Sequence, residues 1–121
     1  MTDFQIATTA WIALALHVAV GVATIRSSGW RPWLPLLNLT VAAGVLAYWA
    51  YRWYGYLFQG VIWYASDQLL PIYEVLVFSL AFLSLSGRYP APTLNWAAFV
   101  LHTIVTLGAV LFVTFFKMRM F

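Results

Sequence analysis

The sequence has very little charge and no cysteine. It contains six Lys or Arg and three Asp or Glu among 121 residues, so charged residues make up 7% of the chain, whereas soluble domains have about a quarter. Without cysteine, disulfides, iron–sulfur ligation and thiolate zinc sites are excluded. The chain also has no glycine-rich phosphate loop, no Ser–His–Asp set and no di-metal cluster of carboxylates and histidines. We therefore predict no catalytic residues and no metal site.

What the sequence does contain is long apolar runs. Residues 4–25, 32–51 and 89–116 carry no charge, and 69–86 is interrupted only by Glu74. A transmembrane helix needs about 20 apolar residues. We predict an all-α integral membrane protein with a single transmembrane domain over residues 1–121, whose four spans cover about 5–25, 33–53, 68–86 and 94–116.

The segment between spans two and three is apolar but too short to cross a membrane. Residues 54–66 are rich in Trp and Tyr, which favour the membrane–water interface. We predict an interfacial aromatic segment there. Aromatic side chains are also enriched at protein interfaces, so we expect the residues that contact partner proteins to be Trp49, Trp53, Tyr56, Trp63 and Tyr64.

The two histidines, His17 and His102, both lie well inside predicted spans. Counted from span ends on the same side of the membrane, they sit about 18 Å and 21 Å deep. Two imidazoles at similar depth, each beside small residues, could hold a b-type haem axially, and one alone could ligate a (bacterio)chlorophyll. The alternative is that each bonds a neighbouring helix, through Asn38, Asn95 or Thr103 for example.

Besides Asp3, the acidic residues are Asp67 and Glu74, which share one helix face. A carboxylate inside a membrane is a candidate proton relay or ion site. Near the start of a helix, however, it can also cap the helix or complement its dipole. We place Glu74 near the interface, at most about 10 Å deep, and predict an ion pair with Arg52.

The stretch LLPIYEVLVF follows a Trp-bearing span and an aromatic link that includes Trp63 and Tyr64. It resembles the small membrane-embedded lycopene cyclase subunits, whose later span carries a Pro-Ile-Glu-Glu motif. Pro71, Ile72 and Glu74 match that motif, and Tyr73 stands where the family has its first Glu. The resemblance implies a membrane-embedded isoprenoid enzyme. The family's upstream acid has no counterpart, and we transfer no catalytic role.

The function that these features favour is that of a small accessory subunit in a larger membrane protein complex. We expect a respiratory or photosynthetic host in a bacterial inner or other energy-transducing membrane, with larger membrane subunits, lipids and a pigment or quinone as partners. The few cations lie near span ends and indicate membrane anchoring, so no nucleic acid is expected. The alternatives are a haem or chlorophyll protein using His17 and His102, and a proton- or ion-coupled transporter using Glu74. The Lys and Arg residues divide three to three between the two sides, so the sequence does not orient the chain.

Overall fold

The computed structural model shows a helical protein with four helices long and apolar enough to cross a membrane. It describes residues 2–27, 32–60, 64, 66–87 and 91–117. The fold class predicted from the sequence is confirmed, and the protein is an integral membrane protein. Its elements are α1 (Asp3–Arg26), α2 (Trp33–Gln59), α3 (Ser66–Leu85), α4 (Pro92–Leu111) and a terminal π-helical turn, η1 (Phe112–Lys117).

Local sequence signals set several helix ends. At the start of α1, the Thr2 side chain accepts from the backbone N–H of Gln5, and the Gln5 side chain accepts from that of Thr2. This reciprocal capping box satisfies two amide donors that a helix start otherwise leaves unpaired. At the C-terminal end of α2, Gly60 adopts the left-handed conformation, with φ of 69°. Glycine takes this conformation at no steric cost and so terminates the helix.

Helix α2 extends beyond residue 53, where the sequence placed the end of span two. It continues without a break to Gln59 and has 27 residues, which makes it about 40 Å long. The reason is that its capping glycine is Gly60, and the aromatic residues before it tolerate a helical backbone. The first half of the predicted interfacial segment is therefore the last turns of α2, while residues 61–63 and 65 lie outside the described part.

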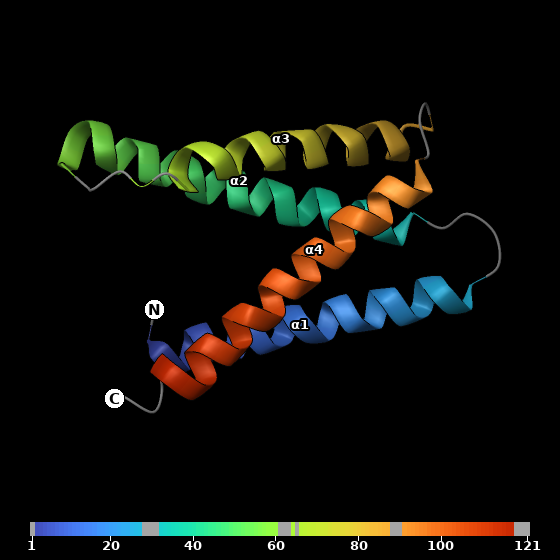
Figure 1. Cartoon of the computed structure of the whole chain (residues 1–121), viewed down its shortest axis with the longest axis horizontal. Coiled ribbons are helices and arrows are strands. Elements are labelled where there is room, and N and C mark those ends of the chain that lie inside the picture. Colours follow the sequence, from blue (N-terminus) through green and yellow to red (C-terminus); the bar gives the residue numbers. More distant parts are fainter. Residues whose placement is uncertain (1, 28–31, 61–63, 65, 88–90, 118–121) are drawn as a thin grey trace.

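The four helices form an open arrangement rather than a closed bundle. Helices α2 and α3 run side by side, α4 crosses them obliquely, and α1 lies against the far part of α4 (Figure 1). The N- and C-terminal ends of the chain lie at the same end of the molecule (Figure 1), as an even number of crossings requires. The apolar core splits into two small clusters, one around Phe99 and one around Ala98. Helix α4 therefore links α1 to the α2–α3 pair.

Buried polar side chains join α2, α3 and α4 at one level. The Asn38 side-chain amide donates to the backbone carbonyl of Asn95 at 2.9 Å, and the Asn95 amide donates to Ser84 Oγ at 2.9 Å. All three side chains are at most 2% exposed. Interhelical hydrogen bonds of this kind strengthen helix association in lipid. Asn38 thus bonds to α4, and Asn95 bonds to α3.

Candidate functional site

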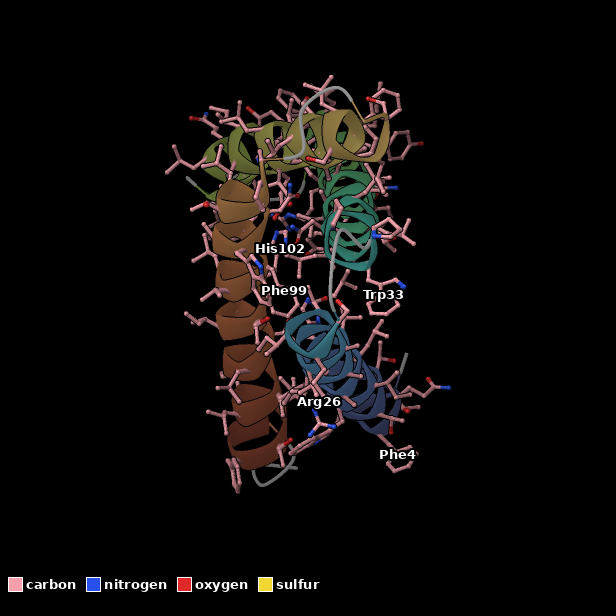
Figure 2. All side chains as sticks on the ribbon, turned by 90° about the vertical axis from the view of Figure 1, so that its right-hand side faces the viewer. Phe4, Arg26, Trp33, Phe99 and His102 are labelled. Carbon is pink, nitrogen blue, oxygen red and sulfur yellow. The ribbon has the colours of Figure 1, made fainter. Side chains whose placement is uncertain are left out.

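The centre of the molecule holds a buried pair, Glu74 of α3 and His102 of α4. His102 Nε2 lies 3.0 Å from Glu74 Oε1 and 3.2 Å from Oε2, and the two side chains are 3% and 5% exposed. Figure 2 shows the His102 side chain directed from α4 towards the interior. At these distances a proton can be shared between carboxyl and imidazole.

The pair lies deep in the membrane region. Glu74 is eight residues from the start of α3 and His102 is ten residues from the start of α4, which correspond to about 12 Å and 15 Å of helix. Those two helix starts lie at opposite ends of the molecule (Figure 1). The pair is therefore close to the middle of a hydrocarbon core about 30 Å thick.

The predicted ion pair between Arg52 and Glu74 is wrong, because Arg52 pairs with Asp67. Arg52 Nη2 lies 2.8 Å from Asp67 Oδ2, and Arg52 Nε lies 3.1 Å from Oδ1. Asp67 also accepts from the backbone N–H of Tyr64 at 2.8 Å. Two turns of helix separate Asp67 from Glu74. Arg52 therefore pairs with Asp67, and Glu74 pairs with His102.

Trp49 completes the junction between α2 and the start of α3. Its indole N–H donates to the backbone carbonyl of Asp67 at 2.6 Å. In a regular helix this carbonyl would accept from the amide of residue 71, but Pro71 has no N–H. Trp49 thus supplies the donor that the proline removes. The spacing between Pro71 and Asp67 was visible in the sequence, but nothing in it identified Trp49 as the donor.

We expect Trp49→Phe to weaken the α2–α3 junction by about 1 kcal/mol, because the Asp67 carbonyl loses its donor. In a Pro71→Ala background, the backbone N–H of residue 71 restores that donor. Trp49→Phe should then destabilise the α2–α3 junction markedly less. A double-mutant cycle on helix-dissociation free energy, measured by steric trapping in bicelles, gives the coupling. Equal costs in the two backgrounds would show that the indole N–H does not replace the missing amide.

The two histidines do not face each other across an open space. The ring of His17 packs on Phe99, with centroids 5.8 Å apart, and Phe99 also lies against Gly21, where a Cβ atom would approach its ring to 3.1 Å. His102 Nε2 is already bonded to Glu74. This arrangement does not fit a haem held between two imidazoles, because the phenyl ring occupies the space between α1 and α4.

His17 is nevertheless held in a defined state. Its Nδ1 donates to the carbonyl of Ala13 at 2.7 Å, while its buried Nε2 has no hydrogen-bond partner within the part of the chain that the structure describes. Because a carbonyl oxygen can only accept, Nδ1 is the donor in that bond, and Nε2 is the ring nitrogen left for a ligand. Ligation of a (bacterio)chlorophyll by His17 alone stays a prediction.

A groove of about 710 Å³ opens beside the Glu74–His102 pair. Helix α2 contributes Gly44 and Tyr48 to it, α3 contributes Tyr73 with Glu74, and α4 contributes His102 and neighbouring apolar residues. Tyr73 packs edge-on against His102, with ring centroids 5.8 Å apart. Among the described residues, neither the Tyr73 hydroxyl nor His102 Nδ1 has a hydrogen-bond partner. The groove therefore combines an apolar wall with buried polar groups.

The aromatic residues predicted to contact partner proteins are divided by the structure. Trp49, Trp53 and Tyr56 stack edge to face along α2, with centroids 6.0 Å and 5.9 Å apart. Tyr56 and Tyr64 are 44% and 57% exposed, and Trp63 lies outside the described residues. Trp49 belongs to the α2–α3 junction, whereas Tyr56 and Tyr64 are the described members of this set with large exposed surfaces. Their role in partner binding stays a prediction.

Comparisons with protein-family models, with curated proteins and with solved structures find no match to this chain. The fold and the site therefore define its class by themselves. It is a four-helix integral membrane protein with a glutamate–histidine pair buried at mid-membrane depth.

Proposed function

We propose that the protein is a small helical subunit of a larger membrane protein complex. The observation that carries this proposal is the open space between α1 and α2. There a groove of about 470 Å³ is lined by apolar side chains and Thr40. The Thr40 hydroxyl donates to the carbonyl of Leu36 at 2.9 Å, so the groove presents no unpaired hydroxyl proton. Its shape and chemistry suit an apolar occupant.

The α1 side of this groove favours a transmembrane helix as that occupant. Ala19 and Ala23 line it, and Ala15 stands one turn before them on the same helix face. Small residues four apart let helix backbones approach closely, and close packing is what holds helices together in lipid. An unpaired alanine face beside an open groove is therefore suited to a partner helix.

The amount of surface left uncovered supports the same proposal. Between 17% and 28% of the residues in the apolar windows of the four spans are buried within the chain. Lipid is as apolar as these side chains and gives no hydrophobic driving force for folding. A larger host would supply the packing that this chain lacks. We expect a respiratory or photosynthetic complex, because such complexes include many small helical subunits.

The test is to enlarge the alanine face. We expect Ala19→Leu with Ala23→Leu to move the tagged chain, in mild-detergent extracts of its native membranes, from a large complex to its free size on native gels. The matched control is Val18→Leu with Val22→Leu, which adds bulk to exposed positions of α1 outside the groove. A photo-crosslinking residue at position 19, but not at 22, should capture one defined membrane protein. Migration of the unmodified chain as a free monomer would overturn the proposal.

A further inference from the structure

We propose that the groove between α2, α3 and α4 binds the head of an isoprenoid quinone, with a quinone carbonyl accepting a hydrogen bond from His102. This inference does not depend on the role as a subunit, because it concerns a different groove and a small molecule. It rests on the protonation of the buried pair, on its depth and on the shape of the groove.

The protonation of the pair determines what a ligand must offer. In an apolar interior a net charge is costly, so the pair favours states with none. There are two such states: a carboxylate with an imidazolium, and a carboxylic acid with a neutral imidazole. In each of them Nε2 is engaged with Glu74, and Nδ1 bears a hydrogen. His102 Nδ1 is buried and has no acceptor among the residues that the structure describes.

A buried donor without an acceptor is destabilising, so a ligand oxygen placed there is stabilising. Tyr73 also lines the groove, and its hydroxyl is a second buried group without a partner among the described residues. The site therefore selects a molecule with one or two acceptor oxygens. Acyl chains of membrane lipids have none.

The depth of the pair excludes the ester carbonyls of ordinary phospholipids. These esters lie at the interface, whereas Glu74 and His102 lie about 12 Å and 15 Å along their helices from opposite ends of the molecule. A ligand must therefore carry its carbonyl into the hydrocarbon layer. An isoprenoid quinone does so, because its ring is itself apolar apart from the two carbonyls and its tail is a hydrocarbon.

The groove also has the size and lining for such a molecule. Its volume of about 710 Å³ falls within the range of small-molecule sites, about 300–1,000 Å³. Its lining is apolar apart from the hydroxyls of Tyr48, Tyr73 and Thr106 and the Glu74–His102 pair. It is thus suited to a flat ring and the first part of an isoprenoid tail.

Two glycines provide a matched test of this site. Gly44 lines the groove, and Gly108 on α4 does not. A Cβ atom added at either position meets no atom within 4 Å, so Gly44→Phe and Gly108→Phe should both fold. The probe is a photoreactive azidoquinone added to native membranes that contain the tagged full chain, with the labelled peptides identified by mass spectrometry.

We expect saturable labelling of α2, α3 or α4 that decylubiquinone displaces and decylbenzene, which has no carbonyl, does not. Gly44→Phe should lower labelling about tenfold or more, because the phenyl ring takes up space that the ligand needs. Gly108→Phe should leave it unchanged. Equal labelling of the two variants, unsaturable labelling, or equal displacement by decylbenzene would each overturn the proposal. A subunit role that fails on native gels would leave this result unaffected.

Discussion

Replacing His102 with leucine is expected to weaken helix association by about 3–5 kcal/mol, the usual cost of removing one partner from a buried acid–base pair. The physical reason is the Glu74 carboxyl left behind, which is 3% exposed. It must either remain ionised in an apolar interior or take up a proton. At neutral pH, protonating an ordinary carboxylate costs about 4 kcal/mol.

Removal of the other partner is expected to cost less. In Glu74→Leu the group left behind is an imidazole, and an uncharged imidazole costs less to bury than a carboxylate. What remains is a buried polar ring without its partner, a penalty of about 1–3 kcal/mol. The double variant Glu74→Leu/His102→Leu, which leaves neither polar group unpaired, should be close to the native protein.

Steric trapping in bicelles measures all three variants on one scale. His17→Leu is the matched control, because His17 is also a buried histidine but its hydrogen bond is to Ala13 of its own helix. It should change helix association by less than about 1 kcal/mol. If His102→Leu costs no more than His17→Leu, the Glu74–His102 contact does not hold α3 to α4.

The second large effect is expected at Asp67. Its carboxylate binds Arg52 through both oxygens and accepts from the backbone N–H of Tyr64. Asp67→Leu removes all of these bonds and leaves the guanidinium of Arg52 without its carboxylate. We expect the first turn of α3 to open, so that hydrogen exchange at the backbone amide of Tyr64, which donates to Asp67, rises by about an order of magnitude.

Asp67→Asn separates charge from hydrogen bonding at this position. The amide oxygen can still accept from the Tyr64 N–H, but the pairing of opposite charges with Arg52 is lost. We therefore expect exchange between that of the native protein and that of Asp67→Leu. Exchange in the last turns of α4, far from this junction, serves as the internal control. A uniform rise along the whole chain would mean that Asp67 stabilises the entire fold rather than the start of α3.

The partner of Glu74 shows where reasoning from the sequence failed. Counting along the helix gave the depth of Glu74 to within about 2 Å, but Arg52 was expected to pair with Glu74. The structure instead pairs it with His102, 28 residues later. Which side chain of one helix faces which of another depends on crossing angles and relative rotation, and a single sequence contains neither. Spacing had related His102 to His17 instead, but Phe99 separates α1 from that part of α4.

The sequence by itself determined that the chain crosses a membrane with four helices, because the lengths of its charge-free runs and the cost of burying charge in lipid allow no other class. It also placed most helix ends within a few residues. Only the tertiary structure decided that α4 crosses the α2–α3 pair, that Trp49 supplies the donor missing at Pro71, and that Glu74 meets His102 at mid-depth. The pattern of apolar residues does not show which face of a helix contacts protein, because lipid and the protein interior are equally apolar. In this chain the helix arrangement follows from a few polar contacts and close-packed small residues.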